Sequence, residues 1–405
     1  MTTKNNIPAG YKDSAVGIIP QEWEVNRLGE ICQTFKSGMT ITSQNIEKSG
    51  LYPVYGGNGL RGYTDSFTHN GDYILIGRQG ALCGNINFIR GKAYISEHAI
   101  AVQPNEGNSI EFLRYKLDFW NLNRFSESSA QPGLSVEKLV RYKLAIPPLA
   151  EQRKIAEILG VWDEAIEKQS RLIEKLELRK RALMQRLLTG RTRLPGFTTP
   201  WQKVKLGEIG TFLSTNTLSR DKLNDNNGSI QNIHYGDILV KYSSIVDAKL
   251  TAIPYVNEDV AISSDYLENG DIVFSDTAED NIVGKAVEIS NIADKKIVAG
   301  LHTMLFRPNK GSYAQHFLGY YLNSDAYRKQ LAPLIQGIKV CSISKRAICH
   351  TIVLTPSLPE QKAIAEVLTA ADNEIATHRK KLDALRIQKR GLMQQLLTGK
   401  TRVKI

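Results

Sequence analysis

The chain has 405 residues, enough for two domains of ordinary size, and its 42% hydrophobic and 23% charged residues are those of a folded globular protein. It has no apolar run of about 18 residues, and its polar first residues lack the apolar core of a secretory signal. Cys32, Cys83, Cys341 and Cys349 follow no metal-like or disulfide-like spacing. These features exclude a membrane protein or a secreted disulfide scaffold, and they predict a cytoplasmic protein.

The net charge of +11 favours a polyanionic partner, but its distribution weakens that argument. Residues 151–193 carry 11 basic and 7 acidic groups, and residues 360–405 carry 10 and 5, so these two segments hold +9 of the excess. Residues 1–150 carry +2 and residues 194–359 carry zero. The excess lies on predicted helices, where a solvated helix face explains it as well as nucleic-acid binding does.

In chain order, the pattern predicts a mixed α/β domain over 1–147, a long helix over 148–192, a second mixed domain over 193–356 and a second long helix over 357–405. The run YILIG (73–77) predicts a strand, and residues 110–120 predict a helix. In the second domain, DILVKY (237–242) and DIVFS (271–275) predict strands, and residues 315–321 predict a helix.

Both long helices carry apolar residues at alternating steps of four and three, which define a coiled-coil seam. Gln169 and Lys180 interrupt the first seam, and His378 and Lys389 interrupt the second at the same places. Prolines precede each helix, and Gly190 and Gly399 end them, so each spacer of about 38 residues is about 57 Å long. The seam residues are Ile155, Leu159, Trp162, Ile166, Ile173, Leu176, Leu183, Leu187, Ile364, Leu368, Ile375, Leu382, Leu385, Leu392 and Leu396.

The two halves are internal repeats. PPLAEQRKIAEILGVWD (147–163) recurs as PSLPEQKAIAEVLTAAD (356–372), and KRALMQRLLTGRTR (180–193) recurs as KRGLMQQLLTGKTR (389–402), at a constant offset of 209. The domain interiors differ in length between the copies, although His98 of the first half matches His302 of the second. A shared frame with divergent interiors indicates a duplicated module whose task differs between copies.

Several motifs that look catalytic have simpler explanations. Residues 57–62 fit G-x-G-x-x-G but lie between turn-forming segments, and Gly399-Lys400-Thr401 lacks the first glycine of a phosphate loop. The seven histidines form no metal motif, and Asp237, Asp271 and Asp276 are typical of turns. No adenine-methylating, motor or nuclease motif is present. We therefore expect no catalytic residues, no metal and no cofactor.

The segment YKDSAVGIIPQEWEVNRLGEI (11–31), the turn at 52–57 and the doubled helix with its LLTG ending together resemble the specificity subunit of Type I restriction-modification systems. The resemblance covers nearly the whole chain, although the second half lacks a clear copy of the Tyr-Pro-Val-Tyr-Gly turn. It implies an α+β fold in which two target-recognition domains are separated by two antiparallel coiled-coil helices with a pseudo-twofold repeat.

The resemblance also implies that each domain reads one half of a split double-stranded DNA site and that the helices set the half-site spacing. Two methyltransferase subunits are implied to dock on the helices, and a translocase–nuclease subunit is a further partner. S-adenosylmethionine and ATP then belong to those partners. Ile158, Val161, Leu172, Leu178 and Met184 fall off the seam and suggest a second apolar stripe for such docking.

Polar residues of the predicted loops are the candidates for DNA contact, because bases are read by side chains that reach groove edges. Each of them is explained about as well by a solvated loop. We favour Arg61 and Arg78, because arginine suits bidentate contact with guanine. The candidates are Lys36, Ser37, Tyr55, Asn58, Arg61, Arg78, Gln79, Gln131, Asn216, Arg220, Lys241, Tyr242, Thr277, Gln336 and Lys339.

Two other functions stay open at this stage. A stand-alone DNA-binding regulator or scaffold would use the same two domains without a methyltransferase. A nucleotide-dependent enzyme would need the glycine motifs to bind phosphate.

Overall fold

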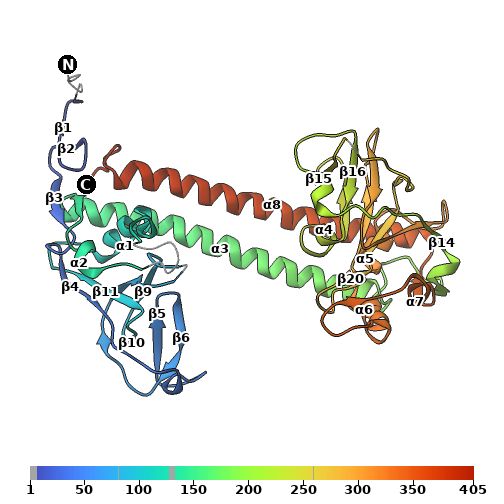
Figure 1. Ribbon diagram of the computed structural model, residues 1–405, viewed down its shortest axis with the longest axis horizontal. Coiled ribbons are helices and arrows are strands. Elements are labelled where there is room, and N and C mark those ends of the chain that lie inside the picture. The colour runs from blue at the N-terminus through green and yellow to red at the C-terminus, as the bar shows by residue number, and fades with distance from the viewer. Residues whose placement is uncertain (1–6, 81, 127–132, 259) are drawn as a thin grey trace. The chain divides into compact units, whose positions relative to one another are not determined.

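The computed structural model describes residues 7–80, 82–126, 133–258 and 260–405 (Figure 1). It divides into two compact units, one made of residues 1–170 with 380–405 and the other of residues 171–379. Helices α3 (Leu149–Leu187) and α8 (Leu358–Leu397) each pass through both units. Each unit therefore contains one mixed α/β domain together with a segment of both long helices.

The first unit is built on two four-stranded sheets. The antiparallel sheet has the order β4-β11-β8-β9, and the second sheet has the order β6-β5-β10-β7, in which β5 and β10 are parallel. A two-stranded sheet joins β3 to β12, directly before α3. The strands are β1 (Tyr11–Lys12), β2 (Ile19–Pro20), β3 (Glu24–Arg27), β4 (Cys32–Ser37), β5 (Tyr52–Gly56), β6 (Gly59–Thr64), β7 (His69–Asn70), β8 (Tyr73–Gly77), β9 (Ile86–Ile89), β10 (Lys92–Ile95), β11 (Ala99–Pro104) and β12 (Lys143–Ile146), and the helices are α1 (Ile110–Phe119) and α2 (Val136–Leu139).

The second unit repeats this plan. Its main sheet has the order β14-β23-β19-β21-β17, a second sheet contains the parallel pair β16 and β22, and β13 pairs with β25 before α8. The strands are β13 (Gln202–Lys205), β14 (Gly210–Leu213), β15 (Leu223–Asn224), β16 (Ile230–Ile233), β17 (Ile245–Asp247), β18 (Tyr255–Val256), β19 (Ile272–Ser275), β20 (Thr277–Ala278), β21 (Ala286–Ser290), β22 (Lys296–Ala299), β23 (Thr303–Pro308), β24 (Cys341–Ser342) and β25 (Ile352–Thr355). The helices are α4 (Tyr235–Val240), α5 (Phe317–Tyr321), α6 (Asp325–Leu331) and α7 (Lys345–Cys349).

The long helices begin within one residue of their predicted starts, but they end at Leu187 and Leu397, before the predicted bounds of 192 and 405. Each starts within two residues of a proline turn, and Gly190 and Gly399 leave the helical conformation with φ of +69° and +73°. All fifteen seam residues are buried or half-buried. In the first unit Ile155 and Leu159 of α3 share one core with Leu396 of α8 and with the sheet residues, and the second unit repeats this with Leu187 and Leu368. The apolar seam residues therefore pack each domain and its helix pair around one shared core.

Two predicted elements are wrong. Residues 52–57 were expected to form a turn, but Tyr52–Gly56 form strand β5. Residues 237–242 were expected to form a strand, but residues Tyr235–Val240 form helix α4. The His234 ring accepts a hydrogen bond from Gly236 N at the start of this helix, and Ile238 and Tyr242, four residues apart, both enter the core. Short apolar runs do not distinguish a strand from a buried helical turn. The strands at 73–77 and 271–275 and the helices near 110–120 and 315–321 are confirmed.

Candidate nucleic-acid interface

In the first domain, three loops meet at one edge of the sheets. These are the turn after β8, the β10–β11 turn and the β5–β6 hairpin. Arg78 N donates to His98 O at 2.9 Å, and Ser96 N donates to Tyr55 O at 2.8 Å. The structure thus brings together residues that are far apart in the sequence.

Two glycines allow this close approach. A Cβ on Gly57 would lie 2.8 Å from His98 O, and a Cβ on Gly38, next to Ser37, would lie 2.2 Å from Ile95 O. Real Cβ atoms do not approach backbone oxygens so closely, so any side chain at either position would push the loops apart. The G-x-G-x-x-G segment therefore forms a hairpin turn that packs the edge, and no helix follows it.

Several predicted side chains at this edge are available for a ligand. Lys36, Asn58 and Arg61 are exposed and Arg78 is half-buried. Within the described residues, none of these four side chains makes a hydrogen bond or ion pair. Unpaired donors on one surface suit an acceptor-rich partner such as DNA.

The other candidates of this domain are hydrogen-bonded or half-buried, which makes them less available to a ligand. Gln79 Oε1 lies 3.0 Å from His98 Nδ1 in a hydrogen bond. Ser37 is half-buried on β4, in register with Ile100, and Tyr55 is half-buried against the core behind β10. Gln131 lies outside the described residues.

In the second domain, the structure gathers three of the predicted residues. Thr277 of β20 pairs with Ser342 of β24, and Ser342 exchanges two backbone hydrogen bonds with Gln336. Lys339 is exposed on the loop between Gln336 and Ser342, beside Ile338, which is 98% exposed. This edge corresponds to the edge at Gln79 in the first domain.

Three further candidates are engaged within the protein. Arg220 and Lys241 lie 2.5 Å and 3.0 Å from the buried carboxylate of Asp237. Asn216 Nδ2 donates to Ala299 O at 2.9 Å, and its Oδ1 accepts from Leu218 N. Each of these three side chains stabilises a loop and is less available to DNA than Arg61 or Arg78.

Tyr242 was predicted to contact DNA, and the structure contradicts this prediction. Only 6% of it is exposed, and it packs in the core of the second domain beside α4. Burial raises the pKa of its phenol well above the usual value. A side chain held there does not reach a base edge, so Tyr242 does not belong to the interface.

A buried charge cluster at the start of each long helix was not foreseen from the sequence. Glu151 is fully buried and accepts two hydrogen bonds from Arg402, at 2.7 and 2.9 Å, and one from the Trp23 indole at 3.0 Å. Glu360 accepts the same fork from Arg193, at 2.5 and 2.7 Å, and one from Trp201 at 3.0 Å. The arginine that follows the end of one helix thus binds the first turn of the other.

The glutamine after each buried glutamate has an equally specific contact. Gln152 Nε2 donates to Pro147 O at 2.9 Å, and its Oε1 accepts from Ser109 N at 2.8 Å. Gln361 repeats both contacts with Pro356 O and Ala314 N, at 3.0 and 2.9 Å. The sequence shows the Glu-Gln pair in both repeats at the same offset, and this repetition could have indicated a shared structural role.

The residues off the seam do not form one stripe. Ile158 and Met184 pack against the cores of their own units, whereas Val161, Leu172 and Leu178 are exposed. Leu172 and Leu178 are six residues apart, which places them about 120° from each other around the helix. The expected second apolar stripe is therefore replaced by separate exposed side chains.

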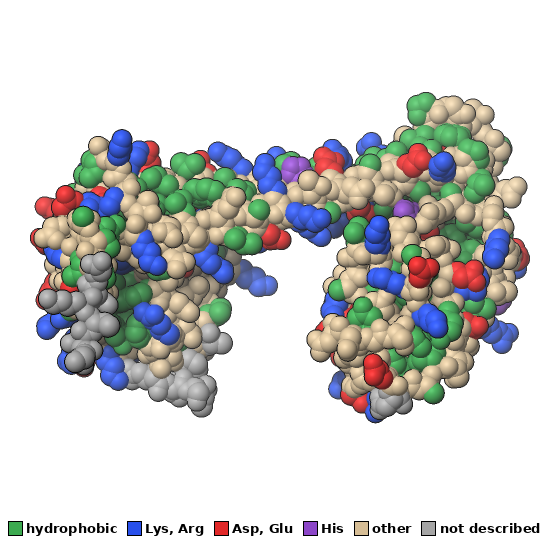
Figure 2. Space-filling model, turned by 90° about the horizontal axis from the view of Figure 1, so that it is seen from above, with side chains coloured by type: hydrophobic (Ala, Val, Ile, Leu, Met, Phe, Trp, Pro, Cys, Tyr) green, Lys and Arg blue, Asp and Glu red, His purple; other side chains and the backbone are tan. Residues whose placement is uncertain are grey.

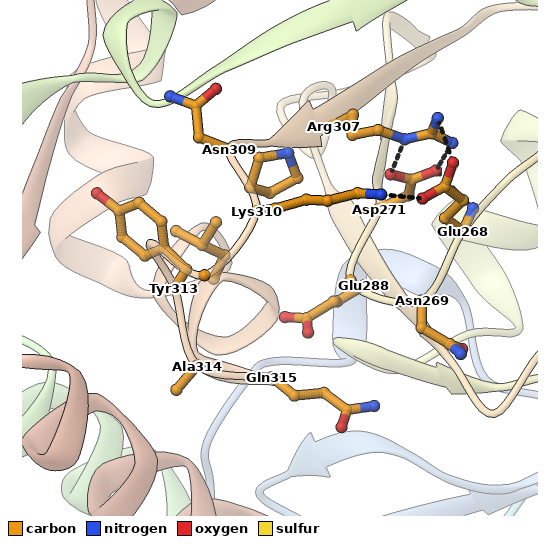
Figure 3. Close-up of a pocket in the computed structure, with 14 residues that line it drawn as sticks. Glu268, Asn269, Asp271, Glu288, Arg307, Asn309, Lys310, Tyr313, Ala314 and Gln315 are labelled. Atoms are coloured by element: carbon orange, nitrogen blue, oxygen red, sulfur yellow. Dashed lines mark hydrogen bonds and ion pairs between the residues drawn. The ribbon is translucent and has the colours of Figure 1, made fainter.

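A polar pocket in the second domain is lined by Arg307, Asp271 and Glu288, among other residues (Figure 3). Its charges are mutually satisfied. Arg307 forms a fork with Asp271 at 2.9 and 2.7 Å and pairs with Glu268, while Glu288 accepts backbone hydrogen bonds from His316 and Gly319. Asp271 precedes β19 and Asp276 follows it, so the strand separates the pocket from the candidate interface.

Charge is mixed over the second unit, where basic and acidic side chains alternate on the face seen in Figure 2. Across the described ranges, no group of three or more His, Cys, Asp and Glu side chains is arranged to hold a metal ion. Among the same residues, no helix is both long and apolar enough to cross a membrane. Loop side chains of mixed charge therefore line the candidate interface.

The fold and the paired loop edges define a duplicated α+β protein whose two domains present equivalent loop edges. The model of the family described as Type I restriction modification DNA specificity domain matches it twice, over residues 20–178 and 198–386. These segments make up most of the chain, which therefore belongs to this family.

Individual relatives agree with this assignment. The MjaVIII specificity subunit of Methanocaldococcus jannaschii is 27% identical over an alignment of length 414, with 95% of this chain and 94% of that protein covered. The EcoprrI specificity subunit of Escherichia coli is 42% identical over 159 residues, which are 38% of this chain and 39% of that one.

Two solved structures share the fold. The S subunit of a Type I restriction-modification system from M. genitalium gives a TM-score of 0.59 at 15% identity and covers 100% of this chain and 99% of that one. A chain from a solved type I R-M system gives 0.58 at 18% identity, with 95% and 99% covered. At these identities the likeness concerns the fold alone.

Proposed function

We propose that this protein is the DNA specificity subunit of a Type I restriction-modification complex. The recognition domains of this proposal are residues 1–147 and 193–356, and the spacer segments, which contain α3 and α8, are residues 148–192 and 357–405. Each domain reads one half of a bipartite DNA site. The observation that carries the proposal is the duplicated loop edge, which keeps one backbone frame in both domains and changes the side chains on it.

The partners of the proposal are double-stranded DNA, two methyltransferase subunits and a translocase–nuclease subunit. The family to which the chain belongs supports docking of other subunits, because a solved chain with the same fold comes from an assembled type I R-M system. The chain then supplies targeting while its partners supply the chemistry and its cofactors. The four free cysteines agree with a reducing cytoplasm.

The test is a map of methyladenine across host DNA after co-expression of this chain with a methyltransferase encoded beside it. We expect one split motif, with two short specific parts around a fixed gap, that is lost when the chain is omitted. A continuous motif, or the same motif without the chain, would contradict the proposal. The stand-alone regulator, which binds DNA without directing methylation, would then be the better explanation.

A further inference from the structure

The turn after β8 holds Arg78 between two neighbouring segments. Its N–H donates to His98 O at 2.9 Å, and its carbonyl accepts from Leu134 N at 2.9 Å. The next residue, Gln79, bridges in antiparallel fashion to Gly133 and bonds the His98 ring at 3.0 Å.

The turn after β19 holds Asp276 in the same frame. Its N–H donates to His302 O at 3.1 Å, and its carbonyl accepts from Ile343 N at 3.0 Å. The next residue, Thr277, pairs with Ser342 and lies 3.3 Å from the His302 ring. The two histidine side chains are 44% and 46% exposed, so both frames open to solvent to the same extent.

Arg78 and Asp276 therefore occupy equivalent positions and carry opposite hydrogen-bonding chemistry. The Arg78 guanidinium only donates, and within the described residues it makes no hydrogen bond or ion pair. The Asp276 carboxylate only accepts; Thr277 Oγ1 donates to its Oδ1 at 2.8 Å, and His302 Nδ1 lies 3.4 Å from the same oxygen. Both contacts use Oδ1, so the carboxylate keeps acceptor capacity on Oδ2.

This difference matches a difference in base edges. Guanine presents two adjacent acceptors in the major groove, O6 and N7, which a guanidinium binds as a fork. Cytosine presents the N4 amino donor, which a carboxylate accepts; adenine places the N7 acceptor beside its amino group and repels a carboxylate there. We propose that Arg78 and Asp276 are equivalent base-reading positions, with Arg78 contacting guanine in one half-site and Asp276 contacting cytosine in the other.

This inference rests on the proposed function and can fail separately from it. The test uses the full chain co-expressed with its methyltransferase, and compares methylation of a plasmid library in which each position of both half-sites is varied. The variants are Arg78→Gln and Asp276→Asn, because glutamine and asparagine both form forks with adenine.

With Arg78→Gln we expect one position of one half-site to change its preference from guanine to adenine. With Asp276→Asn we expect one position of the other half-site to change from cytosine to adenine. Each change should alter discrimination at that position by roughly 5- to 150-fold, the range of one bidentate contact. The half-site read by the unaltered domain should keep its base preferences, and it serves as an internal control for folding.

Matched controls remove the same charge elsewhere in each domain. Arg141 is exposed and follows Val140, whose carbonyl accepts from Gly29 N near the start of β4, away from the edge. Asp294 is exposed before β22, at the end of that strand away from His302. Arg141→Gln and Asp294→Asn should leave every base preference as in the wild type.

Three results would overturn the inference: unchanged preferences in both variants, equal loss at all positions, or both variants acting on the same half-site. If a variant folds but directs no methylation, its affinity is measured for duplexes that differ at one base pair. Unequal loss of affinity among these duplexes supports base reading, and equal loss refutes it. If the wild-type chain directs no split motif at all, the proposed function fails instead.

Discussion

Lys389 Nζ of α8 lies 2.5 Å from Asp163 Oδ1 of α3, and the Tyr115 hydroxyl of α1 donates to the other oxygen of the same carboxylate at 2.5 Å. The second unit repeats the arrangement, because Lys180 and the Tyr320 hydroxyl both bind Asp372, at 2.6 and 2.8 Å. The lysines that interrupt the apolar seams are thus ion-paired. Each cluster joins both helices and the recognition domain of its unit.

We expect Asp163→Asn to lower the free energy of unfolding by about 1–2 kcal/mol, because it leaves a half-buried lysine without its counter-charge. The partial exposure of Asp163 keeps the loss below that of a fully buried pair. Urea denaturation of the full chain measures it. The double variant Asp163→Asn with Lys389→Met should recover part of the loss, and a double variant no more stable than the single one would argue against the pairing.

The arginine forks at Glu151 and Glu360 should contribute more to stability than the Asp163 cluster, because both carboxylates are fully buried. Arg402→Met leaves Glu151 buried without a cation, and we expect it to lower the unfolding free energy by about 3–5 kcal/mol. Arg193→Met should also destabilise the second unit, because it removes the cation that binds the buried Glu360. Calorimetric unfolding of both variants is the measurement, with the exposed Arg141→Met as the control. A loss below about 1 kcal/mol in both would show that the forks contribute little.

Glu288 gives the second unit a pH-dependent stability. Burial raises the pKa of its carboxyl from 4.5 to about 7, against the effect of the two backbone hydrogen bonds that it accepts. The unfolded chain releases this proton as pH rises above 4.5, while the folded chain holds it until about pH 7. The contribution of Glu288 to the free energy of unfolding is therefore largest below pH 4.5. It decreases by about 3 kcal/mol between pH 4.5 and pH 7, and it does not change further above pH 7.

Glu288→Gln stays uncharged at every pH and should remove this decrease. The measurement is the unfolding midpoint of wild type and variant from about pH 4.5 to about pH 8, compared as a difference so that the other titrating groups cancel. Glu279→Gln, at an exposed carboxylate of the same unit, is the matched control. Parallel profiles for wild type and Glu288→Gln would show that the carboxyl is ionised throughout.

The long helices were predictable because their apolar period, proline turns and terminal glycines are local signals that tertiary packing does not override. The roles of Glu151 and Gln152 were not predictable, because their partners Arg402 and Ser109 are distant in the chain. The same reason separates the DNA-contact candidates. Sequence alone places Arg78 and Arg220 alike in polar loops, and only the fold shows that Asp237 binds Arg220. Tyr242 was listed with the loop candidates because the sequence alone does not show that it packs with Ile238 in the core of the second domain.

Lys36 and Lys339 differ from Arg78 in the kind of DNA contact that we expect. Both lysines are exposed, and a lysine ammonium binds a phosphate as a point charge without reading the base. Lys36→Ala and Lys339→Ala should weaken binding to all duplexes to a similar extent, and each should reduce the slope of log affinity against log salt by about 1. Fluorescence anisotropy over about 50–200 mM salt measures both effects on the same duplexes. Lys143→Ala, an exposed lysine of β12 directly before α3, is the control and should leave the slope as in the wild type. If Lys36→Ala changed the preference at one base position while the slope stayed constant, Lys36 would join Arg78 as a base-reading residue.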